Sequence, residues 1–317
     1  MGVRYLKLKV SQRMKKYVNI VIVNYNSTDY LLRCLQRIQE ALGEVDAEIL
    51  VYDNASEDRV DRVEEMFPEV QFSSNRKNLG FSRAVNMALK RCYKPYVILL
   101  NPDTLVQKGF FDSTLEYMEA NKGVAILGPR ILNGDLSVQG SARSFPSPLT
   151  GLFGRSTLMT KWFPNNKMSR RNVITCKSDG ITPMEVDWVS GACMVVRREA
   201  LDDVGFLDER FFLYWEDADW CKRMRASGWK VIYYPRASIV HYAGGSCAES
   251  HIRATVEFHK SAYRLFAKHA KGAQRFAKPL VMWVLALRLL LVISWNVMRR
   301  WSGRTDRHSG PQGREVL

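Results

Sequence analysis

The 317-residue sequence lacks several patterns that mark common protein classes. Its six cysteines are scattered and include no Cys-x-x-Cys pair, which argues against a structural zinc site or a disulfide framework and suits a reducing compartment. No apolar run precedes Val18, so no secretory signal is visible in the basic N-terminus. No Gly-x-Gly-x-x-Gly motif follows the first expected strand, which counts against a dinucleotide-dependent oxidoreductase.

Acidic residues are scarce at both ends of the chain, and the formal net charge is +15. Residues 1–19 carry six basic residues and no acid, and residues 251–317 carry thirteen basic residues against three acids. Residues 20–250 are close to neutral, with 28 basic residues against 29 acids. Because a nucleic-acid-binding protein usually spreads its charge along a binding face, we expect no nucleic-acid partner. Basic ends beside a neutral body fit an anionic membrane surface at least as well.

Apolar runs alternate with helical periodicity through the first 130 residues. The expected strands lie at 18–23, 49–52, 70–73, 96–100 and 124–127. The expected helices lie at 29–42, 57–66, 78–91 and 108–121. This alternation predicts an α/β fold with a mostly parallel, doubly wound sheet.

The following region is less regular. Residues 133–185 are rich in Ser, Pro, Asn and basic residues, and long segments of this kind tend to be functional or disordered. Regularity returns with a strand at 186–196, a helix from Glu216 and a strand at 230–234.

An almost wholly apolar stretch runs from Leu280 to Met298, broken by Arg288 and Asn296. Its length is close to the roughly 20 residues that span a bilayer. Arg288, near its middle, costs about 2.5–3.5 kcal/mol on insertion scales. The stretch is either an amphipathic helix packed on protein or a helix in, or anchored to, a membrane interface. We favour membrane association without deciding whether the helix spans.

Three carboxylates stand among aromatic residues between Tyr214 and Trp220, ahead of a clear helical pattern. If a helix begins near Glu216, Asp217 shares one face with three residues that are otherwise apolar: Trp220, Cys221 and Met224. Asp219 instead precedes Arg223 by four residues, as in a surface ion pair. Asp217 is therefore the acid that points inward, and an inward carboxylate needs a reason.

Polar residues also follow the buried strands, at the edge where parallel sheets bind ligands. Asp53 can accept hydrogen bonds from a ribose or a base, although Asp-Asn is also ordinary turn chemistry. Asp103 can bind Mg²⁺ or Mn²⁺ beside a diphosphate, or it can cap the helix ahead. His241 is expected at the same edge, as a metal ligand or as a structural histidine.

Taken together and in order, these stretches resemble the inverting, nucleotide-sugar-dependent glycosyltransferases of family 2, and most closely a bacterial rhamnosyltransferase-like branch that builds cell-surface polysaccharides. The resemblance covers about residues 18–245. The motifs that carry it are Val21-Ile22-Val23-Asn24-Tyr25-Asn26, Val51-Tyr52-Asp53-Asn54-Ala55-Ser56, Asn78-Leu79-Gly80-Phe81, Leu99-Leu100-Asn101-Pro102-Asp103, Asp187-Trp188-Val189-Ser190-Gly191-Ala192, Phe206-Leu207-Asp208-Glu209-Arg210-Phe211-Phe212, Glu216-Asp217 and His241.

The resemblance implies a GT-A fold, with a Rossmann-like sheet over residues 18–245. Its nucleotide-binding half would cover about residues 18–132, and its acceptor-side half about residues 133–245. A basic segment, 1–17, precedes this domain. A basic, helical and membrane-associated region, 246–317, follows it. The protein would then be cytoplasmic and peripherally attached to the inner face of the cell membrane.

The resemblance also implies roles at the nucleotide end of the site. Asp53 would hold the base or ribose, in a pocket lined by Asn24 and Tyr25. Three further residues would lie near the nucleotide and its phosphates: Asn78, Gly80 and Arg83. Asp103 matches the last acid of an Asp-x-Asp metal motif whose first acid is Asn101 here, and His241 matches a histidine that completes metal binding in some relatives. The expected cofactor is Mg²⁺ or Mn²⁺.

At the other end of the site, Asp217 matches the catalytic base, with Glu216 as the reserve candidate. Gly191 would let the backbone approach the donor sugar, and Trp188 would help to form the acceptor side. An inverting transfer needs one carboxylate to take a proton from the acceptor hydroxyl and a cation to stabilise the leaving diphosphate. Burial against tryptophans raises the pKa of such a base, whereas a helix N-terminus lowers it, and the sequence does not decide between them.

The expected reaction moves a sugar, with rhamnose from dTDP-rhamnose as the first guess, onto a lipid-linked or polysaccharide acceptor. The alternative is a non-catalytic protein of the same fold that binds nucleotide sugars or glycans, because a fold does not determine a function.

Overall fold

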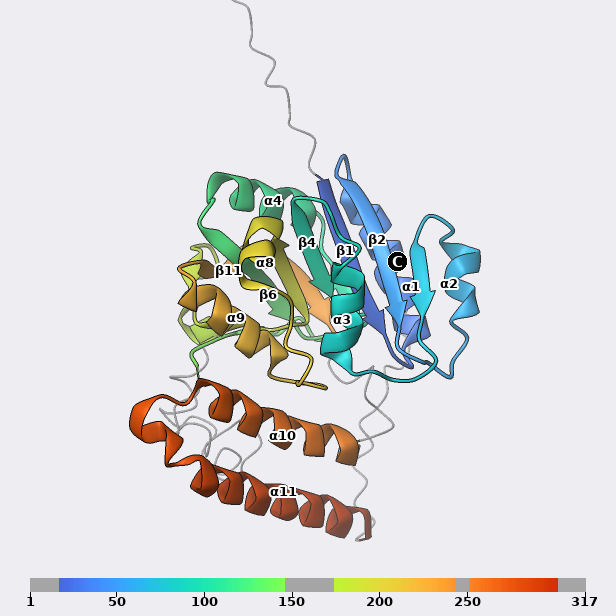
Figure 1. The fold of residues 1–317 in the computed structure, drawn as a ribbon. Helices are drawn as coiled ribbons and strands as arrows, with labels where there is room; N and C mark the ends of the chain where they lie inside the picture. Colours follow the sequence, from blue (N-terminus) through green and yellow to red (C-terminus); the bar gives the residue numbers. More distant parts are fainter. Residues whose placement is uncertain (1–16, 146–173, 243–250, 302–317) are drawn as a thin grey trace, which may run out of the picture.

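The computed structural model describes residues 17–145, 174–242 and 251–301 (Figure 1). A nine-stranded sheet has the order β3-β2-β1-β4-β10-β6-β11-β5, and β8 pairs with β11. Its strands are β1 (Tyr17–Asn24), β2 (Asp46–Asp53), β3 (Gln71–Ser74), β4 (Tyr96–Leu100), β5 (Thr104–Val106), β6 (Val124–Leu132), β8 (Met184–Glu185), β10 (Cys193–Arg197) and β11 (Lys230–His241). A small second sheet pairs β7 (Ala142–Arg143) with β9 (Trp188–Val189).

Strand direction confirms the predicted α/β class with a mostly parallel sheet. Strands β1, β2, β3, β4, β6 and β11 run the same way, whereas β5, β8 and β10 run in the opposite direction. The reversed strand β10 lies between β4 and β6, so both of its neighbours are antiparallel to it.

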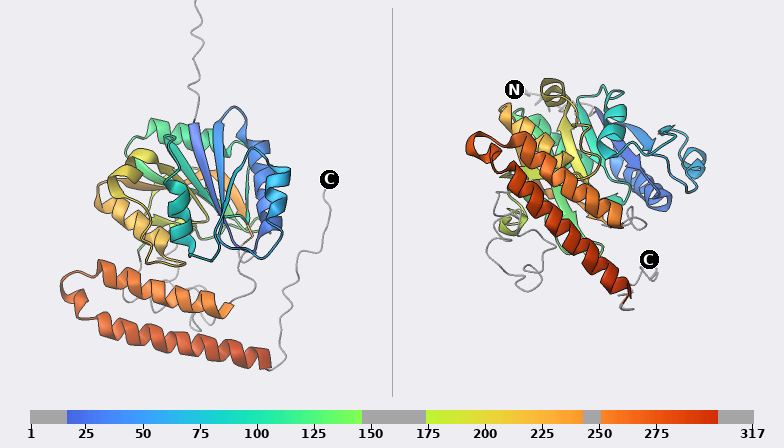
Figure 2. Two further views of the ribbon diagram at one scale, coloured as in Figure 1. Left: turned by 45° about the vertical axis from the view of Figure 1, so that its right-hand side comes forward. Right: turned by 60° about the horizontal axis from the view of Figure 1, so that its bottom comes forward.

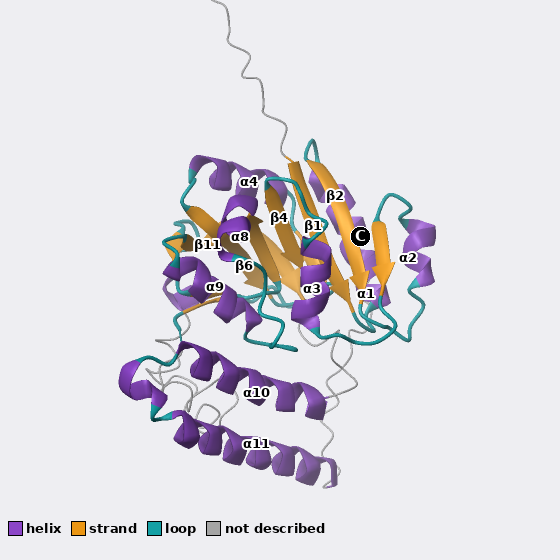
Figure 3. Cartoon of the chain, in the orientation of Figure 1, coloured by secondary structure: helices purple, strands orange, loops and turns teal. Residues whose placement is uncertain are grey.

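Helices cover both faces of the sheet (Figure 3). The helices around the sheet are α1 (Thr28–Leu42), α2 (Asp61–Met66), α3 (Phe81–Leu89), α4 (Phe110–Ala120), α8 (Arg198–Val204) and α9 (Glu216–Ala226), and they are followed by α10 (His251–His269) and α11 (Lys278–Trp301). Alternate residues of β1 enter different cores, because a strand sends successive side chains to opposite faces. Ile20 and Ile22 join the core under α1 and α4, while Val21 and Val23 join the core under α3, α8 and α9.

Two sequence expectations were wrong in detail. The single strand expected at 186–196 is interrupted at residues 190–192, and its two parts belong to different sheets. The helix expected at 57–66 begins only at Asp61. The residues before it are held in a loop, since Glu57 N donates to Asn26 Oδ1 and Asp58 Oδ2 accepts from Thr28 N.

Helices α10 and α11 lie beyond the edge of the sheet toward which β1 and β2 run (Figures 1 and 2). Helix α10 packs on the same side of the sheet as α9. Its Leu265 belongs to the core that also contains residues of α3, α8 and α9, and its Ser261 Oγ donates to Leu213 O (2.9 Å). Helix α11 packs along α10 and presents large apolar side chains to solvent. The segment Lys278–Met298 has a mean hydropathy of 2.1 and is long enough to cross a membrane.

Some sequence expectations lie outside the described residues. They concern residues 1–16, residues 146–173 of the irregular segment, the stretch 243–250 and the basic end 302–317. The domain boundaries proposed at residues 17/18 and 245/246 remain predictions.

Candidate active site

The first group of predicted site residues lies where β1 and β2 end. Asn24 Nδ2 donates to Asp53 Oδ1 (3.0 Å), and Ser56 N donates to Asp53 Oδ2 (3.0 Å). Asp53 is only 2% exposed, and its two oxygens hold the loop that follows β2. Asn24 Oδ1 is buried and has no hydrogen-bond partner in the described part of the chain. Tyr25 is half-buried beside it, where its carbonyl accepts from Ser27 Oγ.

A second group connects this loop to α3. Asn78 Oδ1 accepts from Asn54 Nδ2 (3.0 Å) and from Gly80 N (2.9 Å). Gly80 has a left-handed φ of 85°, and a Cβ there would approach Phe212 O to 2.7 Å. The left-handed backbone and the close approach of Phe212 both require glycine at this position. The absence of a side chain at Gly80 lets the segment before α9, which contains Phe212, pack on the start of α3. Arg83, expected near phosphates, forms an exposed ion pair with Glu209 (3.0 Å).

The third group is the pair predicted to bind metal. Asp103 follows β4, His241 ends β11, and β5 pairs with β11 so that the two side chains meet. His241 Nε2 lies 3.3 Å from Asp103 Oδ1, and its Nδ1 lies 3.1 Å from Gln139 Oε1. Two ligand atoms about 2.1 Å from one cation lie about 3 Å apart, so a carboxylate oxygen and an imidazole nitrogen at this distance fit Mn²⁺ or Mg²⁺.

Among the described residues, this metal pair has no third protein ligand of the usual kind. Within the described residues no group of three or more His, Cys, Asp or Glu side chains gathers that would bind a metal. The remaining ligands of a cation at this position would have to include oxygens of a diphosphate and of water. Such a shared site is ordinary for Mg²⁺, which retains waters and uses substrate phosphates.

The fourth group surrounds the start of α9. Asp217 Oδ2 accepts from Gly191 N (2.9 Å), in the interruption between β9 and β10. The adjacent Ala192 O accepts from Asn101 N (3.0 Å), so this interruption is bonded to the turn that carries Asp103. Asp217 and the Asp103–His241 pair are therefore connected through the backbone of Gly191, Ala192 and Asn101.

The backbone before α9 is strained. Tyr214 and Trp215 both have left-handed φ values, of 67° and 68°. Each such residue costs about 1–3 kcal/mol, and this kind of strain is often found at functional sites. Trp215 is held by aromatic neighbours on both sides, with Trp188 at 6.0 Å and Phe258 of α10 at 5.4 Å between ring centroids.

Burial raises the pKa of Asp217, and the hydrogen bonds from Gly191 and Ala218, together with the charge of Arg143, only partly offset it. The sequence did not show whether burial or the helix N-terminus has the larger effect on the pKa of Asp217. In the structure the effect of burial is the larger. Arg143 lies over the ring of Trp188 at 5.3 Å. Sequence reasoning did not identify Arg143, which belongs to the irregular segment.

Glu216 is buried, with 7% of its surface exposed. Burial raises its pKa well above the ordinary value, and the neighbouring charge of Asp217 raises it further. Its Oε2 has no hydrogen-bond partner within the described residues. Both effects on Glu216 favour its protonated form over its ionised form.

The expectation that Asp219 is a surface residue was wrong. Its predicted partner Arg223 is present at 3.0 Å, but the carboxylate is fully buried. Lys268 Nζ and His269 Nε2 of α10 also reach it, each at 2.7 Å from Oδ1. Burial alone would raise the pKa of Asp219, but hydrogen bonds from His269 and Lys268 outweigh it and lower the pKa. No periodicity within α9 can reveal this, because the partners are 49 and 50 residues away.

Comparison with known sequences identifies the family. A profile of Glycosyl transferase family 2 matches residues 19–205. The chain belongs to this family. A relative from Mycobacterium tuberculosis (strain CDC 1551 / Oshkosh), N-acetylglucosaminyl-diphospho-decaprenol L-rhamnosyltransferase, is 30% identical over 93% of this chain and 96% of its own length. The Escherichia coli (strain K12) rhamnosyltransferase WbbL is 23% identical over 71% of this chain and 83% of its own length.

Solved structures agree on the fold. The mannosyltransferase PcManGT from Pyrobaculum calidifontis, solved with GDP-Man and Mn²⁺, matches with a TM-score of 0.56 and 14% identity, over 92% of this chain and 84% of its own. GalNAc-T7, solved with UDP, GalNAc and Mn²⁺, matches with a TM-score of 0.54 and 16% identity, over 71% of this chain and 43% of its own. These likenesses support the predicted GT-A fold.

Proposed function

We propose that this family 2 protein is an inverting, metal-dependent glycosyltransferase that moves rhamnose from dTDP-rhamnose to a lipid-linked glycan acceptor. The observation that carries the proposal is the position of Asp217, held on Gly191 N and connected through Ala192 and Asn101 to the Asp103–His241 pair. A base and a cation-binding pair in one backbone frame are the two requirements of a one-step displacement.

In the proposed reaction Asp217 takes the proton of the acceptor hydroxyl as that oxygen attacks the anomeric carbon. The bond from that carbon to the diphosphate breaks, and the sugar is transferred with inverted configuration. A raised pKa makes Asp217 a stronger base than an ordinary aspartate. Glu216, whose pKa is raised further by burial and by the neighbouring charge of Asp217, would serve as a hydrogen-bond donor rather than as the base.

Three buried polar atoms without partners in the described residues support substrate binding at this site: Asn24 Oδ1, Trp215 Nε1 and Glu216 Oε2. Such atoms cost free energy unless a ligand or water satisfies them. Asn24 Oδ1 is an acceptor at the nucleotide end, where the imide N–H of thymine or uracil would satisfy it. Trp215 Nε1 is a donor that fits a sugar hydroxyl on the acceptor side. This pattern supports a pyrimidine nucleotide donor.

A divalent cation would be held by Asp103 and His241, and it would stabilise the leaving diphosphate. Asn101, in place of an acid, offers a neutral oxygen, so the diphosphate itself would supply much of the charge that binds the cation. The solved relatives with Mn²⁺ support a cation of this class.

Helix α11 supports attachment to the cytoplasmic face of the membrane. Its exposed side carries large apolar groups: Leu280, Trp283, Leu287, Leu290, Leu291, Trp295 and Met298. Because α11 packs along α10, which is fixed to the core, we propose that it lies in the membrane interface and does not cross it. Deleting residues 279–317 should release the protein from membranes, and unchanged sedimentation with membranes would refute the anchor.

The most direct test is a panel of nucleotide sugars, incubated with an N-acetylglucosaminyl-diphospholipid and with Mg²⁺, Mn²⁺ or a chelator. Release of nucleoside diphosphate reports turnover. We expect release from dTDP-rhamnose only when both acceptor and cation are present. Binding of a nucleotide sugar without any release across the panel would instead indicate a non-catalytic binding protein.

A further inference from the structure

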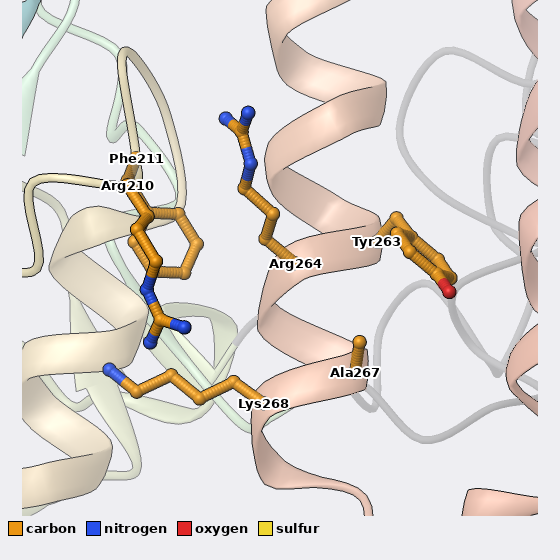
Figure 4. A pocket seen from close by; sticks show the side chains of 6 residues that line it. All are labelled: Arg210, Phe211, Tyr263, Arg264, Ala267 and Lys268. Carbon is orange, nitrogen blue, oxygen red and sulfur yellow. The ribbon is translucent and has the colours of Figure 1, made fainter.

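A cavity of about 450 Å³ lies between the chain before α9 and helix α10. Its lining residues are Arg210, Phe211, Tyr263, Arg264, Ala267 and Lys268 (Figure 4). Figure 4 shows the charged end of Lys268 next to that of Arg210, below the ring of Phe211, whereas the charged end of Arg264 lies apart from them, above the ring. Three cationic side chains around one cavity indicate an anionic ligand.

The charges around the cavity do not balance. The local ion pairs join five cations, namely Arg210, Arg223, Lys260, Arg264 and Lys268, to three carboxylates, namely Asp208, Asp219 and Glu257. Two positive charges are therefore in excess within this part of the described chain. The carboxylates of Asp208 and Asp219 occupy Lys268 at 2.7 Å, so Lys268 mainly holds α10 in place.

Arg264 is the most weakly paired of these five cations. Its nearest carboxylate oxygen, on Glu257, is 3.9 Å away, and Glu257 is already paired with Lys260 at 3.0 Å. Arg264 Nη1 is buried and makes no hydrogen bond within the described residues. The guanidinium is thus available to bind a phosphate through two parallel N–H donors, the geometry that arginine prefers.

The cavity is separate from the proposed catalytic site. It lies on the side of α9 that carries Asp219, whose carboxylate is bonded to Lys268. Asp217 is two residues earlier, which places it about 200° around the helix, and it faces Gly191 instead. A ligand in the cavity would therefore not be the donor or the reacting end of the acceptor.

The position of the cavity relative to α11 suggests the source of the phosphate. Basic residues lie along the same side of α10 as Arg264, because Arg253, Lys260, Arg264 and Lys268 follow one another at spacings of seven, four and four residues. Packed helices lie 8–10 Å apart, and an interfacial helix is buried about 5–10 Å into the boundary of headgroups and acyl chains. With α11 at that depth, α10 lies at the level of the lipid phosphates.

We propose that the cavity between Phe211 and α10 binds the phosphate of an anionic phospholipid headgroup, with Arg264 and Arg210 as its donors. This proposal rests on the membrane attachment proposed above. Insertion of apolar side chains alone would not select among lipid headgroups, whereas this site would favour anionic ones. Because the same site borders the ion pairs of Asp219, a bound lipid would also brace α10 against α9.

The first test uses the full-length protein and dihexanoyl phosphatidylglycerol below its micelle concentration, followed by calorimetry. We expect saturable binding, and at least about 20-fold weaker binding by Arg264→Gln, because a charge-assisted hydrogen bond is lost in addition to a charge. Arg264→Lys keeps the charge and should still be weakened. Arg275→Gln is the matched control, since it removes an exposed positive charge shortly after α10 and outside the cavity lining, and its loss should not exceed about fivefold.

Thermal unfolding of each variant confirms that it is folded. Equal losses in Arg264→Gln and Arg275→Gln, or no loss in Arg264→Lys, would overturn a specific site in favour of diffuse attraction. Binding of inorganic phosphate as tight as that of the short-chain lipid would overturn the lipid as the ligand. Binding to phosphatidylcholine vesicles with 30% phosphatidylglycerol tests the anchor separately. Short-chain binding without vesicle binding would reject the anchor alone.

Discussion

The carboxylates at the ends of β1 and β2 and those at the start of α9 have different environments. At the ends of β1 and β2, Asp53 is satisfied by Asn24 and Ser56 before any ligand arrives. At the start of α9, Glu216 and Asp217 lie in surroundings that raise the pKa of both, and Glu216 Oε2 has no partner within the described residues. A satisfied carboxylate gives a rigid binding frame, whereas an under-solvated one is more basic. On the proposed assignment, the rigid frame of Asp53 holds the nucleotide and the more basic Asp217 transfers the proton.

The same contrast appears within α9. Asp217 and Asp219 are two residues apart, and their environments shift the pKa in opposite directions. Asp219 is bound by Lys268, His269 and Arg223, so its charge is stabilised and serves the packing of α10. Asp217 accepts hydrogen bonds from the backbone N–H groups of Gly191 and Ala218, and these bonds and the charge of Arg143 only partly offset the effect of its burial. Position in sequence is therefore a poor guide to the role of an acid here.

The largest effect should come from removing the base. Asp217→Asn should lower kcat by about 10²–10⁴-fold, because the amide cannot accept the acceptor proton. Nucleotide binding should be unchanged, which titration with the nucleoside diphosphate measures. Since burial raises the pKa of Asp217, wild-type activity should also fall on acidification at a pH above the usual aspartate range near 3.8. Substantial activity in the variant would remove Asp217 from this role.

The next effect is on stability. Asp219→Asn leaves Lys268 and Arg223 without their buried partner, and we expect a loss of about 3 kcal/mol in the free energy of unfolding. Because folding lowers the pKa of Asp219, its contribution is present above the unfolded value near 3.8 and is lost as pH falls through the folded value. Urea unfolding at pH 7 and at lower pH measures both. Asp202→Asn, at an exposed pair with Arg198, is the control and should cost less than about 1 kcal/mol.

A smaller effect should appear in the metal requirement. Asp103→Asn removes one charged ligand, so half-maximal activity should need about tenfold or more Mn²⁺. Asn101→Asp is the opposite change, since it restores an acid at the first position of the motif, and it should lower the requirement. Titrating Mn²⁺ into chelated enzyme measures both variants. Full wild-type activity in excess chelator would exclude the proposed cation.

The smallest effect on turnover should come from Glu216→Gln, because burial and the charge of Asp217 favour the protonated form of Glu216, which the amide resembles. We expect kcat within about threefold of wild type. Since its pKa is raised on folding, the native state holds this proton to a higher pH than the unfolded state, and wild-type stability should fall as pH rises above the ordinary value of 4.5. The variant should lack this fall, which unfolding at a series of pH values detects. A loss of turnover as large as that of Asp217→Asn would make Glu216 the base.

Much of the fold follows from local sequence patterns. The buried runs of β1 and β4 and the periodicity of α1 and α9 identified their elements directly, since these patterns reflect burial within one segment. The failures arose where distant partners decide the structure. The break between β9 and β10 depends on Asp217, and the burial of Asp219 depends on α10. Arg143 reaches the site from a segment without any periodic pattern.

The central claim is that Asp217 drives a single displacement at the anomeric carbon. NMR of the purified product measures it directly, because the one-bond C1–H1 coupling of the transferred sugar gives its anomeric configuration. The proposed mechanism predicts the configuration opposite to that of the donor, formed by the wild type and not by Asp217→Asn. A product that retains the donor configuration would contradict it.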